Sequence, residues 1–360
     1  RELGLEVALD IALQCSPDHP WVSEHPDWFS QRADGSIAYA ENPPKKYQDI
    51  YPLNFDRDPE GIYTAIRDML ELWISHGVKI FRVDNPHTKP VPFWLRLLEE
   101  LHTRYPDVIF LAEAFTRPAM MRTLGAVGFD QSYTYFAWRT YKQEIEEYLT
   151  ELSQETAHLI RPTFWPTTHD ILTPQMTTGG TAIFAIRAML AALGAPSWGI
   201  YSGYEWVENV QRPGAEEPND NEKYEFRPRD PKLAQGTGIP ALLTLLNSAR
   251  ERHPALRQLH DLRIHSTTSD RLLCFSKHVP ARFSPTGVPD TVIVVLSLDP
   301  ENTVEGEVHV DLSGLSLGTS SANFTVVDEL DGQRYSWSTT NWVRLSPWDR
   351  LGHVMAIETE

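Results

Sequence analysis

Short apolar runs that alternate with helix-forming segments constrain the fold of this 360-residue chain more than any other feature. The run 78–84, VKIFRVD, follows a segment that begins at Asp58-Pro59, a helix cap followed by a proline, and ends at Gly77. Short apolar strands separated by helices are typical of a parallel sheet with right-handed crossovers. We predict six strands, at residues 5–13, 78–84, 107–115, 129–136, 158–165 and 196–202. We predict helices near 58–77, 92–105, 118–126, 138–155 and 179–193, and a last one that ends near 252.

Two α/β folds fit this alternation. A doubly wound sheet would normally carry a glycine-rich phosphate turn after an early strand, and the chain shows none. A (β/α)8 barrel needs eight units, of which six can be read here, and it keeps its active site at the carboxyl ends of its strands. The chain opens with RELGLEVALDIAL, which is neither an initiator methionine nor a signal peptide. We therefore predict a (β/α)8 TIM barrel that lacks its first two βα units and comes from a longer protein.

The sequence pattern changes near residue 262. From there on, β-like runs are separated by turns rich in Gly, Pro, Asn and Ser. The runs are residues 271–278, 290–298, 306–313 and 324–330. They predict a C-terminal antiparallel β-sandwich domain. The expected division is a catalytic barrel at 1–260, holding strands three to eight, and an all-β domain at 261–360.

Charge and cysteine content narrow the range of functions. The formal net charge of −17 argues against a general nucleic-acid or anionic-membrane surface. The chain has no run of 18 or more apolar residues, so we expect no membrane span. Its two cysteines, Cys15 and Cys274, are expected to be buried free thiols rather than a disulfide. No metal-binding spacing accompanies the histidines, so we expect no metal.

Three carboxylates follow predicted strands and are candidates for catalysis. Asp84 ends VKIFRVD, Glu113 ends VIFLAE, and Asp170 follows RPTFWPTTH. In a barrel these ends share one rim, and carboxylates from adjacent strands approach to about 5 Å, the separation used in retaining glycosyl transfer. Arg82 shares a face with Asp84 and would keep it ionised as the nucleophile, while Glu113 would act as the acid and base. Each acid alone is equally compatible with a salt bridge or a helix cap; together with Arg82 and His169 they indicate a catalytic site.

These motifs resemble the alpha-amylase superfamily, glycoside hydrolase family 13. FRVD resembles the arginine and nucleophilic aspartate at the end of that family's fourth strand, FLAE its acid/base glutamate, and THD its His-Asp pair. LEVALDIALQC resembles the segment at the third strand, with Asp10 in the position of its aspartate. The Asn-His pair usual there is replaced by Gln14 and Cys15, which speaks against the structural calcium of many amylases.

Longer stretches resemble one subgroup of that family, the maltosyltransferases that extend alpha-1,4-glucans from maltose 1-phosphate. They include ALQCSPDHPWVSEHPDWF, FRVDNPHTKP, FLAEAFTRPAMM and FDQSYTYFAWRT, and they cover most of residues 7–232. The resemblance implies transfer of a maltosyl unit to the non-reducing end of an alpha-1,4-glucan with release of phosphate. It implies no cofactor, a cytoplasmic homodimer, and a role in glycogen-like alpha-glucan synthesis. The subgroup usually reads Asn-Thr-Pro-Asp where this chain has Thr167-Thr168-His169-Asp170.

The same resemblance assigns substrate-binding residues. A phosphate in so acidic a protein needs local cations and donors, and the loop NPPKKYQD offers them, although solvated loop charges are the commoner explanation of such a pair of lysines. The residues implied to hold the phosphate are Lys45, Tyr47 and Asn85. Those implied to contact the maltosyl unit are Gln14, Asp49, Lys223 and Tyr224, with Arg82 and His169 beside the catalytic acids.

Two other functions remain open. The same carboxylates would serve an alpha-amylase-type hydrolase acting on alpha-1,4-glucans, with water as the acceptor; the lysine loop argues against this and His169 slightly for it. A non-catalytic glucan-binding protein on a decayed amylase fold is a third possibility. The intact set of Asp84, Glu113 and Asp170 argues against it.

Overall fold

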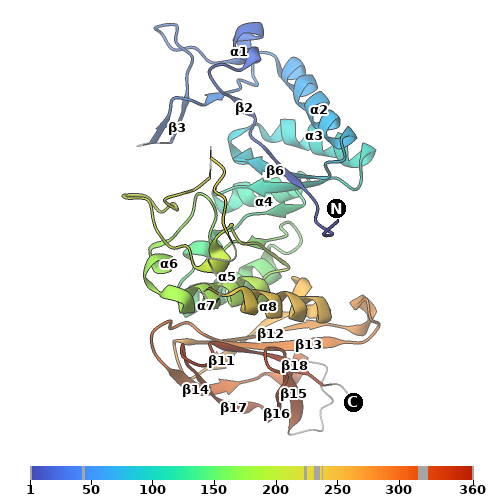
Figure 1. The fold of residues 1–360 in the computed structure, drawn as a ribbon. Coiled ribbons are helices and arrows are strands. Elements are labelled where there is room, and N and C mark those ends of the chain that lie inside the picture. The colour runs from blue at the N-terminus through green and yellow to red at the C-terminus, as the bar shows by residue number, and fades with distance from the viewer. Residues whose placement is uncertain are drawn as a thin grey trace. The chain divides into compact units, whose positions relative to one another are not determined.

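The computed structural model describes residues 2–42, 45–222, 225–230, 236, 238–314 and 323–358. They form two compact units, Arg1–Tyr133 and Thr134–Glu360 (Figure 1). Within the described ranges, no helix is long and apolar enough to cross a membrane. Both cysteines are buried free thiols, as predicted, and burial raises the pKa of Cys15 to about 11.

A four-stranded parallel sheet forms the centre of the first unit. Its strands are β1 (Ala8–Ile11), β6 (Ile80–Asp84), β7 (Ile109–Glu113) and β8 (Gln131–Ser132), in the order β1-β6-β7-β8. Every neighbouring pair is parallel, which confirms the prediction from the strand and helix alternation. The carboxyl ends of β6 and β7 therefore meet at the same edge of the sheet.

Three helices cross between these strands: α2 (Pro59–Ser75), α3 (Val91–Arg104) and α4 (Pro118–Ala126). Helix α2 begins as the sequence predicts, because the Asp58 side chain accepts a hydrogen bond from the Gly61 N–H at 2.9 Å. It ends before Gly77, whose φ of 90° suits only glycine at low cost. The apolar stripe buried against the sheet includes Ile62, Ile66 and Leu70.

The long loop between β1 and α2 has structure of its own. Its elements are β2 (Gln14–Cys15), α1 (Pro20–Glu24), the 3-10 turn η1 (Pro26–Trp28), β3 (Ala40–Asn42), β4 (Lys45–Tyr47) and β5 (Tyr51–Pro52). Strand β2 pairs with β5, and β3 pairs with β4, both antiparallel. The Trp28 indole N–H donates to the Asp58 carboxylate at 3.0 Å and so ties this loop to the start of α2.

The helical part of the second unit contains shorter strands than predicted. The strands are β9 (Thr163–Phe164) and β10 (Ser197–Trp198), which pair in parallel. The helices are α5 (Lys142–Thr150), continued as the π-helical turn η4 (Glu151–Glu155), α6 (Pro174–Thr178), α7 (Gly180–Gly194) and α8 (Pro240–Arg252). The 3-10 turns are η3 (Tyr135–Trp138), η5 (Tyr204–Trp206) and η6 (Pro254–Arg257).

An eight-stranded antiparallel sheet completes the second unit, which confirms the predicted antiparallel domain. The strands are β11 (Leu262–Thr267), β12 (Leu272–Val279), β13 (Asp290–Ser297), β14 (Val304–His309), β15 (Phe324–Asp328), β16 (Arg334–Trp337), β17 (Thr340–Leu345) and β18 (Gly352–Ile357). Their order in the sheet is β16-β15-β18-β13-β12-β11-β14-β17. Short 3-10 turns at Ala281–Phe283 and Leu312–Gly314 connect some of them.

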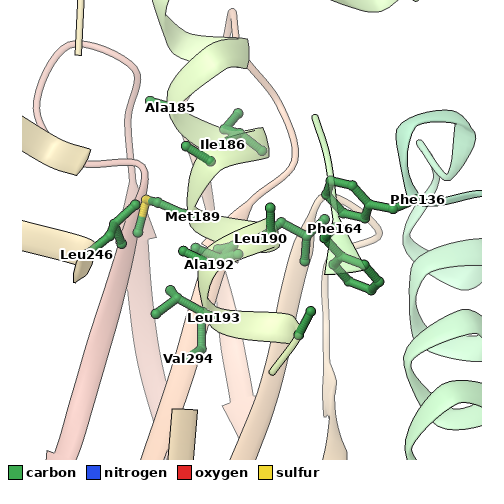
Figure 2. Close-up of a cluster of buried hydrophobic side chains, with 14 of the residues drawn as sticks. Phe136, Phe164, Ala185, Ile186, Met189, Leu190, Ala192, Leu193, Leu246 and Val294 are labelled. Atoms are coloured by element: carbon green, nitrogen blue, oxygen red, sulfur yellow. The ribbon is translucent and has the colours of Figure 1, made fainter. Parts of the chain in front are cut away.

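The two central strands of this sheet are buried on both faces. One face of β12 and β13 packs against α7, where Met189, Leu193 and Val294 meet (Figure 2). The other face, which includes Cys274 and Ile293, forms a separate core with the outer strands. From Ile183 to Gly194 every residue of α7 is buried, and all of them except Arg187 are apolar, as expected for a helix that is enclosed on every side. The predicted domain boundary between residues 260 and 261 falls inside this unit and stays a prediction.

A partly buried arginine and a fully buried lysine lie where α7 ends and the sheet begins. Arg250 donates to the carbonyls of Ala195 at 3.0 Å, Pro196 at 2.6 Å and Leu256 at 3.1 Å. Lys277, fully buried on β12, donates to the same Leu256 carbonyl at 3.1 Å. Burial, and then the nearby Arg250, lower the pKa of Lys277 well below its usual value. The arginine thus satisfies several backbone groups, whereas the lysine adds one bond to a carbonyl that already has a partner.

We predict that removing these two cations lowers the stability of the protein by very different amounts. Arg250→Met should lower the free energy of unfolding by about 3 kcal/mol or more, because it leaves buried carbonyls unpaired. Lys277→Met should cost less than about 1 kcal/mol near pH 7. Because the pKa of Lys277 is lower in the folded than in the unfolded protein, folding releases a proton below about pH 10, and stability should rise with pH. Urea unfolding of the intact protein should show this rise in wild type and a smaller one in Lys277→Met; equal slopes would refute it.

Candidate active site

Two of the predicted carboxylates are neighbours at the edge of the parallel sheet. Asp84 and Glu113 are the last residues of β6 and β7, and they are register partners. Adjacent strands lie about 4.8 Å apart, and partners in a parallel pair direct their side chains to the same face. The fold therefore brings these two acids together from positions 29 residues apart. Glu113 is the more buried, with 8% of its side chain exposed against 21% for Asp84.

Arg82 connects the carboxylates of three strands. Its Nη1 lies 2.8 Å from Asp10 Oδ2 and 3.2 Å from Asp84 Oδ1, and its Nη2 lies 3.7 Å from Glu113 Oε1. Asp10 on β1 is the register partner of Arg82, so strand pairing alone places this contact. Only 11% of the arginine side chain is exposed, and shielding from water strengthens its interactions with Asp84 and Glu113 more than the one with Asp10, whose side chain is 57% exposed. This geometry agrees with the predicted position of Arg82 beside Asp84. It also shows that Arg82 contacts a further acid, Asp10.

The charge of Arg82 is fixed by its surroundings. Burial alone would lower the pKa of its guanidinium, but the carboxylates of Glu113, Asp10 and Asp84 outweigh burial and raise it. The ring of Tyr133 lies 5.8 Å from the guanidinium carbon, and burial raises the pKa of this tyrosine. The site therefore holds a permanent cation in contact with ionisable acids.

The residue after the nucleophile candidate links both acids. Asn85 has a left-handed backbone, with φ of 43° and ψ of 54°, which is uncommon for a residue other than glycine. In this conformation its backbone N–H donates to Glu113 Oε2 at 3.2 Å, and its side-chain amide donates to Asp84 Oδ2 at 3.3 Å. Gln14 Nε2 also donates to Asp84 Oδ2, at 3.4 Å. Two of the predicted binding residues, Asn85 and Gln14, thus contact Asp84 directly.

A buried lysine behind these residues was not predicted. Lys89 is 8% exposed, and its Nζ lies 3.4 Å from the carbonyl oxygens of Asp84 and Asn85. Burial lowers its pKa to about 8, although the charges of Asp84 and Glu113 oppose that shift. The neighbouring His87 is partly buried, and its enclosed Nδ1 has no hydrogen-bond partner. The sequence offered one signal, a lysine five positions after Asp84, but only the folded turn shows that it is enclosed.

The third carboxylate belongs to the second unit. His169 Nε2 lies 3.0 Å from Asp170 Oδ2, and the backbone N–H of Asp170 donates to Thr168 Oγ1 at 3.1 Å. The histidine ring lies 6.3 Å from that of Tyr201. His169 and Asp170, expected to act as a pair, are thus in contact, and their role stays a prediction. That Asp170 shares a rim with Asp84 and Glu113 stays a prediction.

The remaining predicted binding residues lie in loops. Lys45 and Tyr47 are on β4, and Asp49 is in the turn that follows it. Lys223 and Tyr224 lie outside the described residues. The part of the chain just before them is firmly held: the Glu222 carboxylate accepts hydrogen bonds from the Tyr201 hydroxyl at 3.0 Å and from Arg229 at 2.7 Å. Their proposed contacts with a substrate stay predictions.

Comparisons with known proteins identify relatives of this chain. A family model described as "GLGE, C-terminal" matches residues 264–357. The alpha-1,4-glucan:maltose-1-phosphate maltosyltransferase of Arcanobacterium haemolyticum is 58% identical over 99% of this chain, which covers 52% of that protein. Maltosyltransferase 1 of Streptomyces coelicolor is 53% identical, with 99% of this chain and 52% of that protein covered. The chain thus spans about half the length of the curated relatives it matches.

Solved structures support the fold. An alpha-amylase from Lactobacillus plantarum superposes with a TM-score of 0.71 at 18% identity, covering 99% of this chain and 79% of that one. The maltogenic alpha-amylase AmyB from Thermotoga neapolitana gives a TM-score of 0.70 at 14% identity, covering 100% of this chain and 79% of its own. At such low identity these similarities concern the architecture alone.

Lys89 should give the stability of the protein a distinctive pH dependence. Its pKa is about 8 in the folded chain and about 10.4 when unfolded, so folding releases a proton between these values and stability should rise across them. Relative to Lys89→Met, wild type should gain on the order of 2–3 kcal/mol from about pH 7 to about pH 10. Urea unfolding of the intact protein at each pH measures this, with the exposed Lys79→Met as control. A constant difference between wild type and Lys89→Met would show that Lys89 titrates normally.

Proposed function

The chain belongs to the alpha-1,4-glucan:maltose-1-phosphate maltosyltransferase family, and we propose that it carries the catalytic site of such an enzyme. The observation that carries the proposal is the arrangement of Asp84 and Glu113 as register partners, both linked to Arg82. The reaction proposed is transfer of a maltosyl unit from alpha-maltose 1-phosphate to the non-reducing end of an alpha-1,4-glucan, with release of inorganic phosphate.

The geometry suits two successive displacements. Asp84 attacks the anomeric carbon and forms a covalent β-maltosyl ester while the bond to the phosphate oxygen breaks. Glu113 donates a proton to the departing phosphate. It then takes the proton from the C4 hydroxyl of the glucan, which attacks the same carbon and releases Asp84. The two inversions leave the new linkage in the alpha configuration.

Arg82 and Asn85 support both steps. The guanidinium contacts both Asp84 and Glu113 and so holds the two side chains in place beside each other. Asn85 holds Glu113 through its backbone and Asp84 through its side chain, which fixes the distance between the two acids. Asp170, held by His169, would bind sugar hydroxyls and stabilise the positive charge that develops on the ring.

The binding roles follow from the same proposal. In a chain with a net charge of −17, a phosphate group requires local cations and donors, which Lys45, Tyr47 and Asn85 would provide. Gln14, Asp49, Lys223 and Tyr224 would contact the maltosyl unit, as the family resemblance implies. The proposal requires no metal or cofactor.

The proposed architecture is a (β/α)8 barrel with a C-terminal β-sandwich domain at 261–360. Strands β1, β6, β7, β8, β9 and β10 would be six of its eight strands, since two groups of parallel strands alternate with helices in the order a barrel requires. The fold similarity to alpha-amylases over the whole chain supports this. A cytoplasmic location and a homodimer belong to the same proposal.

One observation favours a second candidate, an alpha-amylase-type hydrolase. The His169–Asp170 pair has the residue types of amylases rather than those usual in maltosyltransferases. With water in place of the glucan, the same acids would release free maltose.

We predict that the intact protein, given maltose 1-phosphate and maltohexaose, releases phosphate and yields products that grow in two-glucose steps. Asp84→Asn should lower kcat by roughly a thousandfold or more, because the covalent step is lost. The exposed Asp107→Asn should leave kcat unchanged. Phosphate assay and mass spectrometry of the same samples decide among the candidates. Release of free maltose alone would indicate a hydrolase, and cleavage of maltohexaose without use of the phosphate donor would indicate an amylase.

A further inference from the structure

The turn that follows Asp84 has a feature that the proposed chemistry leaves unexplained. It consists of Asn85 and the 3-10 turn η2 (Pro86–Thr88), and it ends at Lys89. The left-handed backbone of Asn85 costs free energy even for an asparagine, and such a conformation persists only where the surrounding structure holds it. From this conformation Asn85 contacts both Glu113 and Asp84. The surroundings of the turn must therefore contain groups that hold Asn85 in place.

Lys89 bonds the peptide groups on both sides of Asn85. Its Nζ lies 3.4 Å from the carbonyl oxygen of Asp84, which precedes Asn85, and 3.4 Å from the carbonyl oxygen of Asn85 itself. Peptide groups are planar, so the φ and ψ angles of Asn85 set how these two carbonyls are oriented relative to each other. One ammonium that donates to both oxygens therefore restrains both angles. It also offsets the repulsion between the partial negative charges of the two oxygens.

Other donors hold the rest of the turn. Thr88 Oγ1 donates to the Asn85 carbonyl at 2.7 Å, and the Trp94 indole N–H on α3 donates to the Pro86 carbonyl at 2.8 Å. The backbone N–H of Lys89 donates to the same Pro86 carbonyl at 3.1 Å. Of these three side chains, only that of the lysine also reaches the carbonyl that ends β6. It therefore links the turn to the strand that carries the proposed nucleophile.

A lysine is a costly residue at this position. Lys89 is 8% exposed, and burial lowers the pKa of its ammonium to about 8. A methionine would fill a similar volume without removing a charge from water, and such replacements of buried ions are often neutral or stabilising. Stability alone therefore does not account for a lysine here, whereas a role in orienting Asn85 does.

Two acids and one histidine set the electrostatic surroundings of this ammonium. Asp84 ends β6 and Glu113 ends β7, and both favour the charged lysine. His87 lies in η2, where burial and then the neighbouring ammonium lower its pKa. Helix α3 meets the turn with the uncharged indole of Trp94, and α4, which packs against η2, has its one charged side chain, Arg122, exposed. Loss of the lysine's proton therefore removes a positive charge that interacts with both acids.

We propose that Lys89 is a positioning residue whose ammonium fixes the backbone of Asn85. Asn85 in turn holds Asp84 and Glu113 at the spacing that the two displacements require. Lys89 acts through Asn85 rather than on the substrate. When it loses its proton, one donor and the charge are lost, so Asn85 is held less firmly and the two acids lose their spacing. This inference rests on the proposed function, since it names a residue that positions that reaction's acids.

Steady-state kinetics of the intact protein with maltose 1-phosphate and maltohexaose test this role. Lys89→Met should lower kcat about a hundredfold, the effect of misplaced catalytic groups, with both KM values within about threefold of wild type. Lys89→Arg, which keeps a cation, should recover kcat to within about tenfold of wild type. Lys79→Met, which removes an exposed lysine, is the matched control and should change neither kcat nor KM.

The pH dependence of activity adds a readout that a merely structural lysine would not change. In wild type, kcat/KM for maltose 1-phosphate should fall about tenfold from about pH 7 to about pH 9, because the ammonium has a pKa of about 8. The second pKa of a phosphate ester is about 6, so the charge of the donor stays constant over this range. The stability contributed by Lys89 rises over the same range, so unfolding cannot cause the fall. Lys89→Met and Lys89→Arg should lack it, since neither side chain titrates there.

The outcomes separate this inference from the proposed function. If wild type releases no phosphate from maltose 1-phosphate, the proposed function fails and the inference falls with it. If wild type is active and Lys89→Met keeps its kcat, or shows the same alkaline fall as wild type, only the positioning role is wrong. Should Lys89→Met not fold, Lys89→Arg decides: activity without the alkaline fall supports the role, and a fall equal to that of wild type overturns it.

Discussion

The ion pairs of Arg82 are the interaction on which the candidate site depends. Three acids from three strands surround it, at 2.8 Å for Asp10, 3.2 Å for Asp84 and 3.7 Å for Glu113. Without the guanidinium, the mostly buried carboxylates of Asp84 and Glu113 would lie beside each other without this cation, and like charges raise each other's pKa. Strand register places these side chains next to one another, because Asp10 is the partner of Arg82 and Glu113 is the partner of Asp84. The site is therefore a property of the sheet more than of its loops.

The elements predicted best from sequence are those defined by a long periodic pattern. Helix α2 was expected near 58–77 and is found at Pro59–Ser75, and the strands that end at Asp84 and Glu113 were recognised from their apolar runs. Prediction was poorer for β8 and β9, where runs of eight residues form strands of two, because a buried turn is as apolar as a buried strand. Lys89 was missed because its burial depends on how the turn after Asp84 folds, which no local pattern records.

Other cations in this acidic protein donate hydrogen bonds to backbone carbonyls inside the second unit. Three cations of the second unit donate to backbone carbonyls: the buried Arg187 at the turn η3, the partly buried Arg250 after helix α7, and the buried Lys277 at η6. Segments without regular hydrogen bonding leave carbonyls that must find donors when buried. Placing cations there connects helices, turns and the antiparallel sheet into one core. The sheet does not pack as an independent layer, because one face of β12 and β13 belongs to the same hydrophobic core as α7.

The anomeric configuration of the newly formed linkage tests the account most directly. If Asp84 and Glu113 act as neighbouring nucleophile and acid/base, two inversions occur at one carbon, and the donor's alpha configuration must be retained. Proton NMR of glucan extended by the intact protein from maltose 1-phosphate should therefore show only alpha-1,4 linkages between the old chain end and the added unit. A beta linkage at that position would mean a single displacement and would contradict the role assigned to Asp84.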